Sequence, residues 1–412
     1  MTTRLLIWNY LKEKPLQTLL NIFLLSLGIS VITLIILFNN QLQEKIKSNA
    51  RGIDLVVGAK GSPLQLILCN IFHIDFPTGN IKLIEADRLA KHRLVKTAIP
   101  MALGDSYNSF RIVGTNQSYT DLYQATLNSG AWWSKDLEVT IGATVAKRTN
   151  LKIGDLFTSS HGLTKDGHAH EERKYIVTGI LNPSGSVLDN LLLTTVKSIW
   201  LVHEESNTPQ PITNDTVHQS KLVPGVARMD STREITSLLI KYKNPMAIIT
   251  LPRFINTQTN MQAASPAFET ARLFTILGEG IDALTGLAYL LVFISALSIF
   301  IALYNSLKER KYDLAIMRSM GASPRKLFQL IVFEGISLTM LGVLVGLILG
   351  HSAVLLFANF MDNSQQAGFT SLVFYKEEVF ILAGGFVVGF LCSLLPAIQA
   401  YRTDIHKVLA GN

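Results

Sequence analysis

The sequence predicts an α-helical membrane protein with four transmembrane helices plus a large mixed α/β extracytoplasmic domain between helices 1 and 2. Only 16% of the 412 residues are charged and 48% are hydrophobic, whereas soluble proteins carry about 25% charged residues. Four apolar runs are long enough to cross a bilayer, which takes roughly 20 apolar residues. The polar stretch 39–275 separates the first run from the second and is long enough to fold around its own core.

The positions of Lys and Arg predict the orientation of the chain. Cations precede the first apolar run, follow the last one and crowd the loop at 308–326. Membrane proteins concentrate such residues in short cytoplasmic loops. We therefore expect cytoplasmic N- and C-termini and a large periplasmic domain in a bacterial inner membrane. The same clustering explains the net charge of +7, because the cations lie where the chain meets the lipid bilayer. It argues against a nucleic-acid partner.

These observations divide the chain into nine segments. The first apolar run is longer than the core of a signal peptide and has no A-x-A-like site behind it, so we interpret it as a retained anchor. The expected segments are an interfacial cytoplasmic helix at 1–15, transmembrane helices at 16–38, 281–307, 327–357 and 378–400, an extracytoplasmic domain at 39–275, a cytoplasmic loop at 308–326, a short external loop at 358–377 and a cytoplasmic tail at 401–412.

The domain between the first two spans shows the patterns of a mixed fold. Alternating apolar residues predict strands at 109–114, 138–141 and 174–180, and a strand entered through a tight turn within 150–157. Helical stretches are predicted within 81–94 and 186–203. Residues 258–271 are expected to form a helix that enters the second span, and the proline-rich 205–224 a surface loop.

Glycines recur at helical-interface spacing in the last two spans. In lipid, small residues let helices approach closely, because no hydrophobic effect drives the helices together. We therefore assign Gly342, Gly346, Gly350, Gly385 and Gly389 to helix packing. The spans contain few ionisable residues, with Glu334 and His351 near the two ends of the third. An aqueous ion path needs more polar groups than this, which argues against a channel or a secondary transporter.

The basic stretch KERKYDLAIMRSMGASPRKLFQLIVFEG lies between the second and third spans. Tyr312, Ile316 and Ser319 have helical spacing, and Gly321 with Pro324 predicts the end of that helix. A short helix held at the cytoplasmic face is where a soluble partner can push on a membrane protein.

This stretch resembles the signature of the MacB/FtsX/LolC-type permeases, the membrane subunits of one class of ABC transporters. The family pattern is R-x-x-E-x-G-x-x-R-x-x-G-A followed by a glutamate in the next span. Arg310, Arg318, Gly321, Ala322 and Glu334 match it, whereas Asp313 and Ala315 replace the usual glutamate and glycine. The chain is thus similar to a divergent member, and its ending LLPAIQAYRTDIHKVL and the order of its segments resemble the family too.

The resemblance implies that the protein transmits motion from a cytoplasmic ABC ATPase, in two copies, to its external domain. It also implies a second permease, identical or different, and a periplasmic adaptor or substrate-binding protein. The ATPase-coupling residues would be Arg310, Asp313, Arg318, Gly321, Ala322, Ser323, Pro324 and Glu334. The sequence has no G-x-x-x-x-G-K-[ST] motif. ATP and magnesium are therefore expected on the ATPase, with no enzyme activity or cofactor in this chain apart from a candidate zinc site.

That candidate zinc site is the segment SSHGLTKDGHAHEER, which is rich in imidazole and carboxylate groups. Such side chains are good zinc ligands, and a glycine-containing loop can fold them around one ion. The alternative interpretation is a solvated hairpin tip. The candidate metal ligands are His161, His168, His170 and Glu171, joined by His73 and Asp75 if the segment 54–81 approaches the loop.

The segment 54–81 contains the apolar run LQLILCNIFHI, which has two interpretations. It is either a structural element of the domain or an amphipathic element presented to the membrane or to an apolar cargo. The expected cargo is accordingly a lipoprotein, a lipid or a small hydrophobic compound. The alternatives are transport or hand-over of zinc, and a mechanotransmitter that activates an external enzyme and transports nothing.

Overall fold

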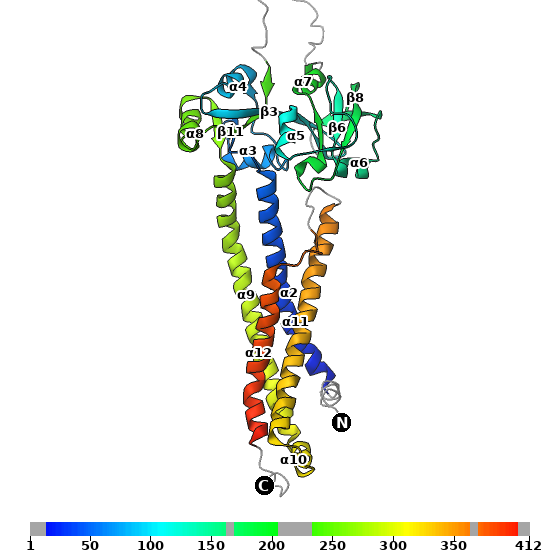
Figure 1. Ribbon diagram of the computed structural model, residues 1–412, viewed down its shortest axis with the longest axis vertical. Helices are drawn as coiled ribbons and strands as arrows, with labels where there is room; N and C mark the ends of the chain where they lie inside the picture. Colours follow the sequence, from blue (N-terminus) through cyan, green and yellow to red (C-terminus); the bar gives the residue numbers. More distant parts are fainter. Residues whose placement is uncertain (1–13, 162–168, 205–232, 363–369, 403–412) are drawn as a thin grey trace, which may run out of the picture. The chain divides into compact units, whose positions relative to one another are not determined.

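The computed structural model describes residues 14–161, 169–204, 233–362 and 370–402. The chain divides into two compact units, Met1–Gln43 with Ile276–Asn412, and Glu44–Thr275. Four described helices are long and apolar enough to cross a membrane, which confirms the predicted fold class. They are α2 (Pro15–Asn49), α9 (Pro266–Glu309), α11 (Pro324–Asp362) and α12 (Lys376–Tyr401) (Figure 1).

Glycines in α11 set the contact between α11 and α2. A Cβ atom built on Gly346 would lie 2.7 Å from Cβ of Ile29 and 2.8 Å from the carbonyl oxygen of Ser26. Such separations are too short for carbon atoms, so only glycine permits this approach. The other two glycines repeat the contact one turn away, Gly342 against Leu25 and Gly350 against Thr33.

Glycines in α12 form the matching contact with α11. A Cβ atom on Gly385 would lie 2.4 Å from Cγ2 of Val343, and one on Gly389 would lie 2.1 Å from Oγ1 of Thr339. Gly384, the neighbour of Gly385, has nothing within 4 Å of a built Cβ atom. The five predicted packing glycines thus lie on the helix faces that meet another helix, and Gly384 does not.

Polar contacts join the C-terminal half of α11 to the start of α12. Nε2 of His351 lies 3.0 Å from Oε2 of Glu378, and Nδ1 lies 2.6 Å from the carbonyl oxygen of Ser371. The side-chain amide of Gln41 on α2 donates to the carbonyl of Thr370 at 2.8 Å. Because each ionisable group has a partner, the cost of placing it among apolar helices is reduced.

The unit Glu44–Thr275 contains twelve described strands, ten in one sheet and two in another. They are β1 (Leu55–Ala59), β2 (Ile81–Lys82), β3 (Val95–Tyr107), β4 (Phe110–Gly114), β5 (Leu127–Gly130), β6 (Glu138–Ile141), β7 (Leu156–His161), β8 (Ala169–Leu181), β9 (Leu191–Thr194), β10 (Glu234–Ile235), β11 (Ser237–Tyr242) and β12 (Met261–Ala264). The helices are α3 (Pro63–Asn70), α4 (Leu83–Ala90), α5 (Gln117–Leu122), α6 (Ala143–Thr149), the 3-10 helix η1 (Val187–Asn190), α7 (Val196–Glu204) and α8 (Ala247–Gln258).

The long strand β3 is shared by two lobes of this unit. The main sheet has the order β12-β1-β11-β3-β4-β9-β6-β8-β5, and β7 pairs with β3 and β8. The first half of β3 pairs with β11, and its second half pairs with β4 and β7. Figure 1 shows α4 and α8 on one side and α6 and α7 on the other. The pairs β4–β9 and β6–β8 are parallel and the rest antiparallel, as expected of a mixed fold.

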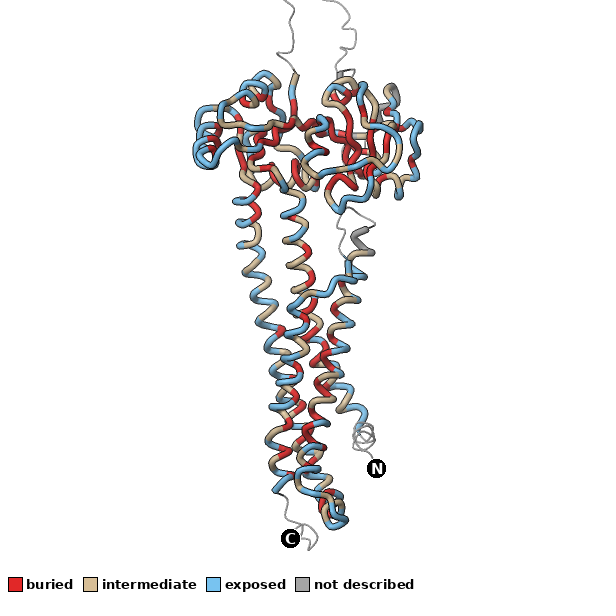
Figure 2. Tube along the Cα trace, viewed as in Figure 1, coloured by how far each residue is buried: buried red, intermediate tan, exposed pale blue. Residues whose placement is uncertain are grey.

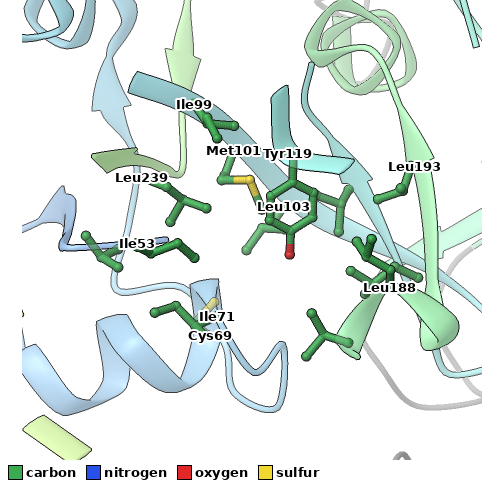
Figure 3. Close-up of a cluster of buried hydrophobic side chains, with 14 of the residues drawn as sticks. Ile53, Cys69, Ile71, Ile99, Met101, Leu103, Tyr119, Leu188, Leu193 and Leu239 are labelled. Carbon is green, nitrogen blue, oxygen red and sulfur yellow. The ribbon is translucent and has the colours of Figure 1, made fainter. Parts of the chain in front are cut away.

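Apolar side chains fill both faces of the central strands. On β1, Val56 belongs to one buried cluster, whereas Leu55 and Val57 belong to another on the opposite face, as strand alternation requires. Figure 2 shows that buried residues concentrate along these strands. Figure 3 shows the first cluster, in which Tyr119 of α5 lies beside Met101 of β3, and Cys69 of α3 lies beside Ile71. The middle of the apolar run that begins in α3, from Leu66 to Ile71, therefore belongs to the core, whereas Ile74 at its end is 58% exposed.

Sequence periodicity located most, but not all, elements of this unit. The predicted strands at 109–114, 138–141 and 174–180 coincide with β4, β6 and part of β8. Helical stretches are present within 186–203 as predicted, in η1 and α7, but the residues between them form the buried strand β9, because an apolar run does not distinguish a buried strand from a helix. The helix predicted over 258–271 is also wrong at its start, since residues 261–264 pair with β1 and α9 begins at Pro266.

Replacing Gly346 by Val is expected to destabilise the membrane unit, because the added carbons must push Ile29 away. Overpacking of this kind costs about 1–3 kcal/mol. The measurement is the midpoint of thermal unfolding in detergent. Gly384→Ala is the control, and it should leave the midpoint unchanged or raise it slightly, since alanine favours helices over glycine. Equal midpoints for the Gly346→Val variant and the wild type would contradict this packing.

Candidate functional site

The short helix α10 (Lys311–Ser319) lies between α9 and α11 at the predicted position. Asp313 is in its first turn and Arg318 in its last, which suits the helix dipole at both ends. Leu314 and Ala315 are buried, and Leu314 packs against the ends of α9, α11 and α12. The helix is therefore seated on the helical bundle by one apolar face.

The C-terminus of α10 is closed by a Schellman motif. The amide of Ala322 donates to the carbonyl of Met317, and the amide of Gly321 donates to the carbonyl of Arg318, both at 3.0 Å. Gly321 has φ +98°, a left-handed conformation that glycine adopts without strain. Ser323 then leads to Pro324 at the first position of α11, where a proline costs no hydrogen bond. The predicted stop at Gly321 and Pro324 is confirmed.

An ion pair joins the N-terminal end of α10 to α11. Nη1 of Arg310, the residue that precedes α10, lies 3.4 Å from Oε1 of Glu334 on α11. Their side chains are only 13% and 10% exposed. Removing one partner of a buried pair strands the other charge and costs about 3–5 kcal/mol. The two residues that matched the family pattern on either side of α10 thus contact each other.

A second ion pair was missed by the sequence analysis. Lys14, just before α2, contacts Glu309 at the end of α9. Both side chains are about half exposed, at 44% and 55%, so this pair contributes little to stability. Neither residue carries a local signal, because each stands in a run of charged residues at a membrane boundary.

The face of α10 that points away from the bundle is exposed in this chain. Tyr312, Ile316 and Met320 lie at i, i+4 and i+8, and are 58%, 37% and 83% exposed. Residues at this spacing share one side of a helix. The cations Arg325 and Lys326 are exposed at the beginning of α11. The result is an apolar ridge beside positive charge, which we call the α10 ridge (Tyr312, Ile316 and Met320).

Four candidate metal ligands lie outside the described residues, either entirely or in their side chains. His168 lies outside the described residues. His161 ends β7, and His170 and Glu171 are in β8, but the described part of these three residues is the backbone alone. The zinc site therefore stays a prediction at these four positions.

His73 and Asp75 are described, and they do not lie together in a ligand set. His73 is fully buried, and its Nε2 lies 2.9 Å from the hydroxyl oxygen of Tyr119. Asp75 accepts a hydrogen bond from the amide of Phe76. Within the described residues, no three His, Cys, Asp or Glu side chains gather closely enough to hold a metal ion. His73 belongs to the core around α3 and α5.

Another polar contact escaped the sequence analysis altogether. Asp105 on β3 and His203 on α7 lie 3.2 Å apart, measured from Oδ1 to Nε2. The two residues are far apart in the sequence and belong to different kinds of element. Only the fold brings them together, so no spacing rule could have found them.

Two family models match the chain. The model described as "FtsX-like permease C-terminal" matches residues 285–405, which include α10 and the last two spans. The model described as "MacB-like periplasmic core domain" matches residues 18–210. The order of these matches agrees with one span, an extracytoplasmic domain and then three spans.

Similar proteins and solved structures of known description agree with these two family models. The chain is 22% identical to the "Macrolide export ATP-binding/permease protein MacB" of Wolinella succinogenes over 97% of its own length, but it spans only 59% of that relative. The periplasmic region of MacB from Actinobacillus actinomycetemcomitans is 16% identical, with a TM-score of 0.33, over 56% of this chain and 97% of that structure. The extracellular domain of the transporter YknZ from Gram-positive bacteria is 12% identical, with a TM-score of 0.30, over 52% of this chain and 99% of that structure. At these scores the structural likenesses add nothing to the family models.

Replacing His73 by Asn is expected to make the protein less sensitive to acid. Burial and, to a smaller extent, the positive charge of Arg111 together lower the pKa of His73 to about 3. An unfolded histidine has a pKa of about 6.5. Between these values the unfolded chain binds a proton that the folded chain does not, so stability falls as the pH drops from about 6.5 towards 3.

Asparagine tolerates the left-handed conformation of position 73, where φ is +56°. The fall in the thermal unfolding midpoint between neutral and mildly acidic pH should therefore be smaller in His73→Asn than in the wild type. Tyr119→Phe removes the hydrogen-bond partner but keeps the imidazole, so that variant should retain the acid sensitivity. An identical pH profile in His73→Asn and wild type would show that His73 does not titrate on unfolding.

Proposed function

Because the chain belongs to the MacB/FtsX-type family of ABC transporter permeases, we propose that it transmits ATP-driven motion from an ABC ATPase, through α10, to its extracytoplasmic domain. The observation that carries this proposal is the ion pair between Arg310 and Glu334. A helix attached to the bundle only by flexible ends would move without moving its neighbours. The buried ion pair and the buried Leu314 instead make α10 and the start of α11 move together.

The ATPase would bind the α10 ridge. Tyr312, Ile316 and Met320 offer an apolar strip that is exposed in this chain, and the adjacent Arg325 and Lys326 offer positive charge. Interfaces of this kind place aromatic and aliphatic side chains at their centre and charges at their rim. Asp313, Arg318, Gly321, Ala322, Ser323 and Pro324 would keep the ridge in place by shaping the two ends of α10.

Motion received by α11 would spread through close helix contacts. The glycines of α11 lie directly against side chains of α2, and the glycines of α12 lie directly against side chains of α11, with no room for a Cβ atom at the contacts. Tight packing transmits displacement because such contacts cannot compress. Helices α2 and α9 continue in sequence into residues 44–275, which gives the motion a covalent route to the extracytoplasmic domain.

The proposed assembly contains two copies of the ATPase and a second permease, identical or different, in a bacterial inner membrane. The termini of this chain would face the cytoplasm, and ATP with magnesium would bind to the ATPase. In the relative from Wolinella succinogenes, ATP-binding and permease functions are named for one protein, of which this chain spans 59%. For this chain we propose that the ATPase is a separate chain. We also propose a periplasmic adaptor or substrate-binding protein as a partner.

The proposed cargo is a lipoprotein, a lipid or a small hydrophobic compound. Its support is the family, including the relative named for macrolide export. The apolar residues Leu66 and Ile67 are core residues of α3, so they do not add to this support. Transition-metal handling by the His161–His170 loop is the second candidate, and its support is the imidazole and carboxylate side chains of that segment. Activation of an external enzyme, with no cargo, would appear instead as ATP hydrolysis that no hydrophobic compound changes.

A photo-crosslinking amino acid at position 312 or 320 tests the docking surface. In membranes that contain the assembled complex, both positions should give a crosslink to the ATPase. The same amino acid at Leu372, which is 84% exposed and precedes α12, is the control and should give none. Crosslinks from position 372 alone would place the ATPase at the wrong end of the helices and overturn the proposal.

Reversal of the Arg310–Glu334 pair tests the transmission step. Arg310→Glu and Glu334→Arg should each lower the permease-dependent stimulation of ATP hydrolysis in proteoliposomes by about tenfold or more, because each strands like charges in a buried site. The double variant restores opposite charges and should recover much of the stimulation. Amounts of assembled complex are compared by co-purification. A double variant as defective as the singles would show that the residues act separately.

A further inference from the structure

The extracytoplasmic unit contains a cleft between the C-terminal ends of α4 and α8 that the coupling function does not use. Its cavity has a volume of about 590 Å³, and small-molecule sites usually measure roughly 300–1,000 Å³. Leu89 of α4 and Met261 of β12 line the cavity, and both are buried core residues, so the cleft has an apolar floor. Figure 1 shows α4 and α8 on the same side of this unit. We call this feature the α4–α8 cleft.

Hydrogen bonds fix the two turns that border the cleft. After α4, the amide of His92 donates to the carbonyl of Leu89 at 3.0 Å. After α8, the hydroxyl of Thr259 donates to the carbonyl of Ile255 at 2.7 Å and accepts from the amide of Met261 at 3.1 Å. A cleft whose walls are already ordered loses little conformational entropy when a ligand binds, which favours binding.

Positive charge exceeds negative charge in the lining of the cleft. Lys60, which follows β1, and Arg88, in the last turn of α4, both line the cavity and are exposed. Neither has a hydrogen-bond or ion-pair partner among the described residues. Of the described residues in the lining, only Glu85 carries a carboxylate, and it forms no ion pair with Arg88 one turn later on α4. A cleft with an excess of one charge attracts ligands of the opposite sign, so this one favours an anion.

His92 and Phe254 form an aromatic wall of the cleft. Their rings are stacked, with centroids 5.7 Å apart and planes at 23°, and both residues line the cavity. Nδ1 of His92 accepts a hydrogen bond from the amide of Leu94 at 3.3 Å, so the ring proton lies on Nε2. That Nε2 has no hydrogen-bond partner among the described residues. Phe254 is 43% exposed, so the wall offers ring surface as well as a hydrogen-bond donor to a bound molecule.

We propose that the α4–α8 cleft binds a small organic anion that carries an aromatic ring system. Lys60 and Arg88 hold its acidic group, and Nε2 of His92 donates a hydrogen bond to it. The rings of the ligand lie against Phe254 and over the apolar floor. A carboxylate, a sulfonate or a phosphate ester presents the oxygen atoms that these donors recognise. This site is independent of the ATPase-coupling role of α10, which stands whether or not an anion binds.

The test is binding of naphthalene-2-sulfonate to the full-length protein in lipid nanodiscs. Binding is measured by equilibrium dialysis, with protein-free nanodiscs as the blank, and the wild type should bind one molecule per chain. Lys60→Gln and Arg88→Gln should each weaken binding by about fivefold or more, because each removes a charged donor from the sulfonate. Lys96→Gln, which removes a cation of the same unit outside the cleft lining, is the matched control and should bind as the wild type does.

Two analogues and a second pair of variants separate the parts of the ligand. Naphthalene-2-sulfonamide keeps the rings but is neutral, and methanesulfonate keeps the charge but has no rings. Both should bind at least about tenfold more weakly than the probe. Phe254→Ser should also weaken binding of the probe. Ile249→Ser should not, because it removes another exposed apolar side chain of α8 that does not line the cavity.

Thermal unfolding protects the test against a misfolded variant. Without the probe, Arg88→Gln and Lys96→Gln should unfold at the midpoint of the wild type, because both positions are exposed. The probe should raise the midpoint of the wild type and of Lys96→Gln, since it binds the folded chain, and the increase should shrink in Arg88→Gln. Absence of saturable binding above the blank would overturn the proposal. So would equal binding of the probe and its neutral sulfonamide, or binding that is unchanged in both Lys60→Gln and Arg88→Gln.

Discussion

Close approach of helix backbones at glycines is the constraint on which the membrane unit depends. Lipid is as apolar as leucine, so the helices gain no hydrophobic free energy by packing on each other and rely on van der Waals contact. Gly346 and Gly385 place α2 and α12 directly against α11. The same helices hold α10, because Leu314 is buried against residues of α9, α11 and α12.

The sequence predicted the features that depend on neighbouring residues. The Lys308–Gly335 stretch contained the periodicity of α10, the glycine of its Schellman motif and the proline that opens α11. Four spans and the packing glycines followed from hydropathy and spacing alone. In the extracytoplasmic unit, β6 was located to the residue because Glu138–Ile141 alternates clearly between turns. Local signals suffice where a local interaction determines the structure.

Features that depend on distant pairing were beyond such reasoning. Residues 261–264 form β12 because β1 offers them a free edge, although their own composition favours a helix. The Asp105–His203 contact needs β3 and α7 to be packed together, and neither residue stands in a recognisable motif. His73 was a reasonable ligand by type, but its chemistry is set by burial beside Tyr119. Burial and long-range pairing arise only from the complete fold.

The position of β1 has a consequence for how the protein is made. This strand lies between β11 and β12, so both of its partners come from the far end of the extracytoplasmic unit. At ~5–20 residues per second, synthesis reaches those partners only tens of seconds after Leu55 has emerged. During that interval an apolar strand has two unpaired edges, which favours aggregation. Residues 55–59 are therefore prone to aggregate until the last two strands arrive.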